Sequence, residues 1–315
     1  MVGPPPVPLS GERVSIGALQ PIARRSSFVY LDRCVVHRDS NAIVALDDEG
    51  STYLPAASIA VLQLGPGTRI THQAMHLLGE SGVVTCWVGD GGSRLYASAP
   101  ALSQSTRLLE QQARLVSRRT TRLAVARQMY QMRFPGADVS RATMQQLRGM
   151  EGARVRGLYR ELATKYEVEW HGRRYDAGNA SAGDPTNRAL SVANSVLYGL
   201  MHAVIVATGC SPGLGFVHTG HVLSFVYDMA DLYKANVSIP AAFEVSAEGP
   251  DRFESAVRRA VRDRTHGIRL LDKAVEDIHS LLGLSSDKDI TAPAVSLFDE
   301  KLGVVAAGTN YADDP

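Results

Sequence analysis

Cysteine is scarce in this sequence, with only three among 315 residues. Cys34, Cys86 and Cys210 show no CxxC-type spacing, which excludes a zinc knuckle and a disulfide framework. The scarcity is typical of a protein kept in a reducing compartment. Glycine contributes only 28 residues, so a collagen-like chain is excluded as well.

Long apolar runs are also missing. The longest mostly apolar stretch, residues 196–210, is interrupted by His202 and is shorter than the roughly 20 residues that a membrane span needs. The Pro-rich start, MVGPPPVPLSGERVS, lacks the apolar core of a signal peptide. We therefore expect a soluble, cytoplasmic protein with no membrane partner.

The chain has little net charge, +1 in all, but its charges are clustered. Residues 107–133 contain seven arginines and a single acid, Glu110. Arginine favours bidentate contact with phosphate, and rows of arginine bind nucleic acid backbones. A solvated helix face is the alternative, although such faces usually alternate in sign. Beyond residue 285 the balance reverses, with six acids against two lysines.

The spacing of apolar residues predicts an α+β fold, in which a small N-terminal β domain is followed by a larger all-α C-terminal domain. Short apolar runs separated by Gly- and Asp-rich turns predict the strands. These are expected at 28–36, 42–46, 58–64, 83–88 and 94–97. One short helix is expected at 71–79, capped by Thr71 and stopped by Gly79.

From Leu102 onward the apolar residues recur at helical spacing. Helices are expected at 104–132, 140–166, 186–208, 224–235, 238–247 and 250–282. We divide the chain into a β-rich domain at 1–98, a helical domain at 99–284 and a flexible tail at 285–315.

Two aspartates lie three residues apart in an apolar segment near the middle of the helical domain. We expect Ser224 to cap a helix that starts at Phe225, so that Asp228 and Asp231 share one helix face. Buried carboxylates need a compensating cation or hydrogen bonds. Mg²⁺ or Mn²⁺ suits carboxylate oxygens, and His218 in the preceding Gly-rich segment would favour Mn²⁺. The alternative is that the aspartates only complement the helix dipole.

Glu151 lies between two glycines in a basic helix. It is either an exposed ion-pair partner of Arg154, or a side chain beside which something large approaches the backbone, since glycines cost helix stability. Two motifs are absent. No glutamate follows His72 in the pair His72/His76, and no Walker lysine follows the glycines at 89–92, so a zinc protease and a P-loop enzyme are excluded.

Four strings together resemble the CRISPR-associated spacer-acquisition integrases, the larger subunit of the adaptation complex, and most closely their subtype I-E branch. The resemblance runs from about residue 9 to residue 247. The strings are QLRGMEG at 146–152, GRRYD at 172–176, GFVHTG at 215–220 and LSFVYDMAD at 223–231.

The resemblance implies a metal site made of Glu151, His218 and Asp231, with Asp228 as an accompanying catalytic acid and Mg²⁺ or Mn²⁺ as the ion. It also implies the reaction: a 3′-OH of a foreign DNA fragment attacks a phosphodiester at the CRISPR repeat. The ion would orient the hydroxyl and offset charge on the phosphate.

The resemblance further implies that the protein binds double-stranded DNA, both fragment and repeat. It implies a homodimer, bridged to another by a small ferredoxin-like second CRISPR-associated subunit. Tyr30 is a candidate wedge against the end of the fragment duplex, or else a structural tyrosine. The DNA-contacting arginines implied by the matching strings are Arg69, Arg94, Arg148, Arg173 and Arg258.

Two other functions are alternatives, and the first of them would use the same residues. A structure-specific nuclease would cut branched DNA with water as the nucleophile. A scaffold subunit would hold DNA and the partner without chemistry. The carboxylate cluster favours an enzyme over a scaffold.

Overall fold

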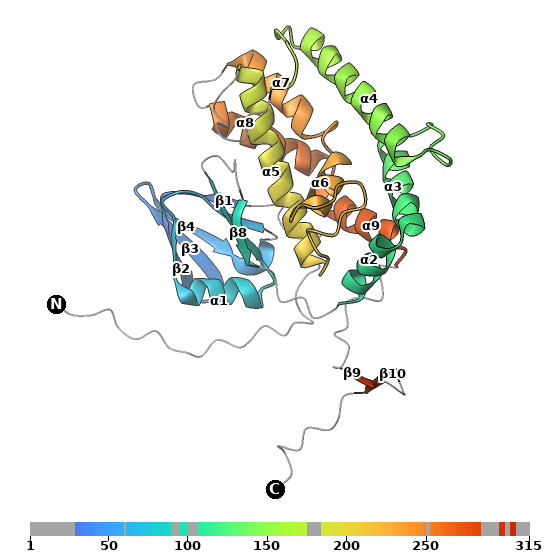
Figure 1. Ribbon diagram of the computed structural model, residues 1–315. Helices are drawn as coiled ribbons and strands as arrows, with labels where there is room; N and C mark the ends of the chain where they lie inside the picture. The colour runs from blue at the N-terminus through green and yellow to red at the C-terminus, as the bar shows by residue number, and fades with distance from the viewer. Residues whose placement is uncertain are drawn as a thin grey trace, which may run out of the picture.

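The computed structural model describes residues 29–59, 61–89, 95–99, 106–174, 184–249, 253–284, 296–299 and 303–306. Within these residues a β-rich part precedes a helical part, and Figure 1 shows the two side by side. The predicted α+β architecture, a small β region followed by a larger helical one, is therefore confirmed.

The β-rich part contains two four-stranded sheets. The strands are β1 (Val29–Leu31), β2 (Val35–Asp39), β3 (Ala42–Asp47), β4 (Gly50–Pro55), β5 (Val61–Leu64), β6 (Arg69–Ile70), β7 (Val84–Val88) and β8 (Leu95–Ala99). One sheet has the order β4-β3-β2-β6 and the other β1-β5-β7-β8. In the second sheet β5 pairs in parallel with β1 and β7, and β8 pairs antiparallel with β7.

Helix α1 (His72–Glu80) confirms the predicted Thr71 cap, because the Thr71 side chain accepts a hydrogen bond from the Ala74 N–H. The helix continues one residue past the predicted stop and ends at Glu80. The sequence does not predict β4. Most of its residues are exposed and show no apolar alternation, so its backbone pairing with β3 is what places it.

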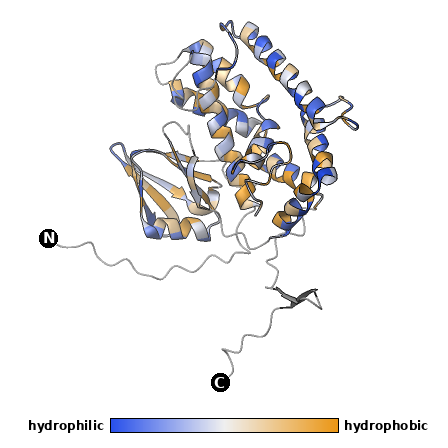
Figure 2. Ribbon diagram, viewed as in Figure 1, coloured by the Kyte–Doolittle hydropathy of each residue, from blue (hydrophilic) through white to orange (hydrophobic). Residues whose placement is uncertain are grey.

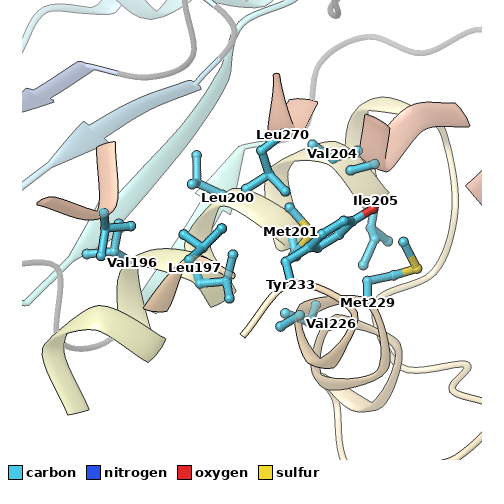
Figure 3. Close-up of a cluster of buried hydrophobic side chains, with 14 of the residues drawn as sticks. Val196, Leu197, Leu200, Met201, Val204, Ile205, Val226, Met229, Tyr233 and Leu270 are labelled. Carbon is cyan, nitrogen blue, oxygen red and sulfur yellow. The ribbon is translucent and has the colours of Figure 1, made fainter. Parts of the chain in front are cut away.

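The helical part is built around one long, buried helix. The helices are α2 (Arg107–Ser117), α3 (Arg119–Arg133), α4 (Met144–Lys165), α5 (Pro185–Ala207), α6 (Ser224–Asp231), α7 (Ser238–Glu248), α8 (Phe253–Gly267) and α9 (Leu270–Leu282). Helices α6 to α9 all pack on α5. Figure 3 shows Leu200 and Met201 of α5 in the same buried cluster as Met229 of α6, Tyr233 and Leu270 of α9.

Among the described residues, α5 is the one helix long and apolar enough to cross a membrane. However, 72% of its most apolar window is buried inside the protein. Burial of this extent is expected for the core helix of a globular fold. By contrast, α4 is hydrophilic along much of its length (Figure 2), and only Leu147 and Leu162 are buried on it.

The two parts share an apolar core, because α5 also packs against β7 and β8. Val61, Val84 and Cys86 from the second sheet belong to the same buried cluster as the helices. A polar contact joins the parts as well. The guanidinium carbon of Arg258 on α8 lies 4.7 Å from the ring centroid of Tyr30 on β1.

Two predicted helices are each broken in the structure. The helix expected at 104–132 divides at Arg118, whose backbone is extended. There the Ser117 and Thr121 hydroxyls donate to the carbonyls of Ala113 and Leu115, and such side-chain bonds compete with helix continuation. Apolar spacing continues through the break without Gly or Pro, so the sequence carries no stop signal.

The helix expected at 250–282 divides at Arg269, which has φ 49° in the left-handed region. Its side chain pairs with Asp272 in the first turn of α9. In the expected tail, β9 (Ser296–Asp299) and β10 (Gly303–Ala306) form an antiparallel pair. The remainder of that segment lies outside the described residues, so the predicted flexibility of the tail stays a prediction.

Candidate active site

Asp228 organises the loop that carries His218. Its side chain is fully buried and accepts hydrogen bonds from the backbone N–H groups of Phe216, Val217 and His218, at 2.5, 3.0 and 2.9 Å. A second bond to His218 joins the carboxylate to the ring Nδ1, at 2.7 Å. This bond is the main cause that raises the pKa of His218 above its usual value. It also leaves Nε2 on the opposite side of the ring.

The same loop requires a glycine at position 215. A Cβ placed there would lie 2.6 Å from the His218 carbonyl oxygen and 2.8 Å from the backbone of Ser224. The predicted cap of α6 is wrong: Ser224 is the first residue of the helix, and Leu223 precedes it at the N-cap position. The Ser224 hydroxyl instead donates to the His221 carbonyl and accepts from the His221 N–H. The Ser224 hydroxyl therefore stabilises the tight turn before α6 and does not cap the helix.

Two arginines hold the carbonyl side of this loop. Arg122 on α3 donates to the Phe216 carbonyl and Arg148 on α4 donates to the Val217 carbonyl, each at 2.9 Å. The loop is therefore fixed from both sides, by Asp228 through its N–H groups and by the arginines through its oxygens. Arg148, predicted to contact DNA, is exposed but already has this partner inside the protein.

Asp231, at the end of α6, lies between two cations. Its Oδ1 is 2.7 Å from Lys234 Nζ and its Oδ2 is 4.0 Å from Arg133 Nη1. Burial by itself would raise the pKa of Asp231, but Lys234 and Arg133 hold the pKa below its usual range. Lys234 and Asp231 sustain each other's charge, since Asp231 raises the pKa of Lys234 against the effect of burial.

Glu151 reaches the same cluster from α4. Its Oε2 accepts a hydrogen bond from the Tyr130 hydroxyl at 2.5 Å, and its Oε1 lies 2.8 Å from Arg133 Nη2. The alternative pairing with Arg154 is therefore wrong. Arg154 lies over the ring of Phe134 instead, 4.8 Å from the ring centroid. A helix carries side chains in every direction, and only the packing of α3 against α4 decides which arginine Glu151 meets.

Arg133 brings the two predicted acids together, because one guanidinium faces both Glu151 and Asp231. Two carboxylates that share a cation are the kind of donor set that a hard divalent ion prefers. In the described part of the chain, no three His, Cys, Asp or Glu side chains stand close enough together to hold a metal ion as they are. The types of donor suit a divalent ion, but the guanidinium of Arg133 lies between the carboxylates of Glu151 and Asp231.

The other predicted DNA contacts lie in different surroundings. Arg69 is exposed at the edge strand β6. Arg173 donates to the side chains of Asn187 and Ser191 on α5. Arg258 and Tyr30 stack on each other, as described above. Arg94 lies outside the described residues.

Sequence reasoning missed four residues of this cluster. Tyr130 and Arg133 lie one turn apart at the end of α3, and the second belongs to the arginine row that the sequence reveals. Lys234 follows Asp231 by three residues, a spacing that predicts an ion pair on a helix. Tyr227 gave no signal, yet its ring lies 5.8 Å from that of His218 and 5.0 Å from that of Tyr198.

The model of the family described as "CRISPR associated protein Cas1" matches residues 28–137 and 136–277, which include the whole site. The chain belongs to this family. It is 46% identical over 295 residues to the CRISPR-associated endonuclease Cas1 of Clostridium sp. (strain SY8519), covering 93% of this chain and 98% of the relative. It is 45% identical over 298 residues to a Cas1 endonuclease of Thermus thermophilus, covering 92% and 91%.

Solved structures of the Cas1 family share this architecture. The crystal structure of a TtCas1–DNA complex is similar with a TM-score of 0.64 and 46% sequence identity, over 82% of this chain and 97% of that one. The Cas1 match places Glu151, His218, Asp228 and Asp231 in the second matched segment, within the helical part.

Proposed function

We propose that this Cas1 family member is a metal-dependent DNA integrase and endonuclease. The 3′-OH of a foreign DNA fragment would attack a phosphodiester of the CRISPR repeat and so join the fragment to the array. The observation that carries the proposal is the meeting of Glu151 and Asp231 at one guanidinium, beside an imidazole that Asp228 holds in place. The naming of its relatives as CRISPR-associated endonucleases, and the complex of TtCas1 with DNA, support this class of reaction.

Glu151, His218 and Asp231 are the ligands that we propose for Mg²⁺ or Mn²⁺. Once bound, the ion would orient the attacking hydroxyl and offset charge on the phosphate. Two carboxylates and one imidazole suit these hard ions, and the imidazole favours Mn²⁺. Asp228 is a positioning residue in this scheme, because its carboxylate is already committed to the His218 loop.

DNA would bind through arginine contacts to its phosphates. Arg69 and Arg148 are exposed and can reach a backbone from β6 and α4. Removal of either contact should weaken binding by a similar amount for all DNA sequences. Arg148, Arg173 and Arg258 already bind protein groups, so we expect their loss to lower stability together with DNA affinity.

Three further parts of the proposal rest on the resemblance of the sequence motifs. They are assignment to the subtype I-E branch, assembly as a homodimer, and a small ferredoxin-like second subunit that bridges two such dimers. Tyr30 as a wedge belongs with them, and it would require Arg258 to leave the tyrosine ring.

The alternatives differ in their products. A structure-specific nuclease would use water instead of a 3′-OH at the same residues, so cleavage would occur without joining. A scaffold would bind DNA without changing it. The meeting of Glu151 and Asp231 at one guanidinium disfavours the scaffold, because a pure scaffold has no use for a carboxylate cluster.

An integration assay separates these functions. The full chain, with its small partner, would receive a short 3′-OH duplex and a supercoiled plasmid that carries the repeat, in Mn²⁺ or Mg²⁺. Asp231→Asn and EDTA would be run in parallel. Asp277→Asn is the matched control, because Asp277 is also buried but accepts a hydrogen bond from Tyr233 outside the acid cluster.

We expect fragment joined to plasmid with the wild type and with Asp277→Asn, and none with Asp231→Asn or EDTA. Cleavage without joining would favour the nuclease. DNA binding without any strand chemistry in either metal would favour the scaffold.

A further inference from the structure

The guanidinium of Arg133 is fixed in position by its surroundings. Its side chain is 10% exposed at the end of α3. Its guanidinium carbon lies 5.4 Å from the ring centroid of Tyr130 and 5.3 Å from that of Phe134. Two rings and a carboxylate therefore define where this cation lies, and the packing directs it between Glu151 and Asp231.

The charges in this cluster balance without any added ion. Glu151 and Asp231 carry two negative charges, and Arg133 and Lys234 carry two positive ones. A divalent ion between the two carboxylates would lie next to the guanidinium of Arg133, while the nearby Asp228 carboxylate is already bonded to the His218 loop. Like charges at such short range in a poorly solvated site repel each other strongly.

Each carboxylate oxygen of Glu151 already accepts a hydrogen bond in this arrangement. Its Oε1 is bound by Arg133 and its Oε2 by the hydroxyl of Tyr130. The two donors differ in kind, because the phenol is neutral and can keep its bond while the other oxygen binds a metal. The guanidinium is charged and lies on the side that faces Asp231, so it is the group that conflicts with an ion.

We propose that Arg133 is the counter-cation of Glu151 and Asp231 in the metal-free protein, and that it must give up this place when a divalent ion binds. Metal and guanidinium then compete for the same two carboxylates. Arg133 keeps the two acids close together until the ion arrives, and it sets how tightly the ion is held. The inference rests on the proposed metal site, and it adds a positioning residue that also limits metal affinity.

Binding of Mn²⁺ to the full chain, without DNA, tests the competition. Electron paramagnetic resonance of free Mn²⁺ gives the affinity without any need for activity. Arg133→Gln removes the charge and should tighten Mn²⁺ binding by about tenfold or more, since a repelling charge beside the ion is lost. Arg133→Lys retains a positive charge and should bind Mn²⁺ much as the wild type does.

Tyr130→Phe and Asp231→Asn complete the set. Tyr130→Phe removes the other donor to Glu151 without changing charge, so we expect a change of less than about threefold, the effect of one neutral hydrogen bond. Asp231→Asn should abolish binding. If Arg133→Gln binds Mn²⁺ no more tightly than the wild type while Asp231→Asn does not bind it, the proposed competition is wrong but the proposed metal site is supported. No binding by any variant would overturn both.

A measurement on the wild type guards against failure of Arg133→Gln to fold. The side-chain N–H resonances of Arg133 would be followed by NMR during a Mg²⁺ titration. We expect them to shift and to lose the features of a bound guanidinium as Mg²⁺ saturates. Saturation by Mg²⁺ with these resonances unchanged would contradict the inference.

Discussion

At the scale of single residues, Asp228 binds the chain itself. It lies three residues before Asp231 on α6, and the two carboxylates nevertheless have different partners. Asp228 accepts three backbone N–H groups and faces the His218 ring, whereas Asp231 pairs with Lys234 and Arg133. A carboxylate that accepts four hydrogen bonds from one loop holds that loop in place. Asp228 therefore affects the site through the position of His218.

Asp228→Asn should destabilise the protein and loosen the His218 loop. An amide has one acceptor oxygen and turns an NH₂ group toward backbone donors, so buried N–H groups lose their partners. Each such loss costs about 1–3 kcal/mol, and we expect a decrease of that order in the free energy of unfolding. Chemical denaturation measures it, and hydrogen exchange should show faster exchange at Phe216 and Val217. Asp231→Asn is the control, and equal protection of the loop in both variants would refute this role.

At the scale of elements, α5 depends on its first turn as much as on its apolar length. Asp184 precedes the helix and accepts a hydrogen bond from the Asn187 N–H at 2.8 Å. Asn187 in turn accepts from Arg173 and from the Arg174 backbone. The first turn of α5 is thus hydrogen-bonded to the segment that contains Arg173, a predicted DNA contact. Partial burial by itself would raise the pKa of Asp184, but hydrogen bonds donated by Asn187 hold the pKa below its usual value.

The charge of Asp184 should stabilise the fold in a pH-dependent way. Because the folded-state pKa is lowered, the stabilisation is fully present above the unfolded-state pKa of about 3.9 and is lost as pH falls through the folded-state value. Asp184→Asn retains a capping side chain without the charge. We expect the wild type to be more stable by about 0.3–1 kcal/mol at pH 7. Denaturation at pH 7, 5 and 3 should show this difference shrink at pH 3, and a constant difference would contradict it.

At the scale of the whole molecule, the β-rich and helical parts meet across a buried interface that contains an unsatisfied polar side chain. Gln63 on β5 is 1% exposed, and neither of its amide atoms has a hydrogen-bond partner among the described residues. It faces Gly199 of α5, where an added Cβ would lie 2.8 Å from its amide nitrogen. The close approach of the sheet to α5 thus depends on Gly199. In this packing the Gln63 amide has no hydrogen-bond partner among the described residues.

Gln63→Leu should therefore stabilise the protein. Removal of a buried amide that lacks partners removes its desolvation cost, which is about 1–3 kcal/mol, and leucine fills a similar volume. We expect a higher melting temperature, measured by calorimetry, with DNA affinity unchanged because the site lies elsewhere. Gln111→Leu serves as a comparison, since Gln111 does donate to the Leu282 carbonyl and should lose stability. A lower melting temperature for Gln63→Leu would mean that the amide has a partner.

The sequence by itself determined the order of the parts and pointed to the candidate site residues. Turn signals and short apolar runs predicted most strands, helical spacing predicted the helical domain, and the Thr71 cap was correct because local hydrogen bonds decide it. Asp228 and Asp231 stood out because acids in apolar surroundings need compensation, and the resemblance of the sequence motifs added Glu151 and His218 to the candidate site. These are all local properties.

Only the tertiary structure decided which of these groups meet. The helix break at Arg118 has no Gly or Pro, and the break at Arg269 follows Gly267, the last residue of α8; at both breaks a side chain takes a local partner. The pairing of Glu151 with Arg133 instead of Arg154 follows from the packing of α3 beside α4. Asp228 and Asp231 share one short helix, yet one anchors a loop and the other faces a guanidinium. Each element packs its side chains against elements that are distant in sequence. The spacing of residues within one element does not determine which distant elements it contacts.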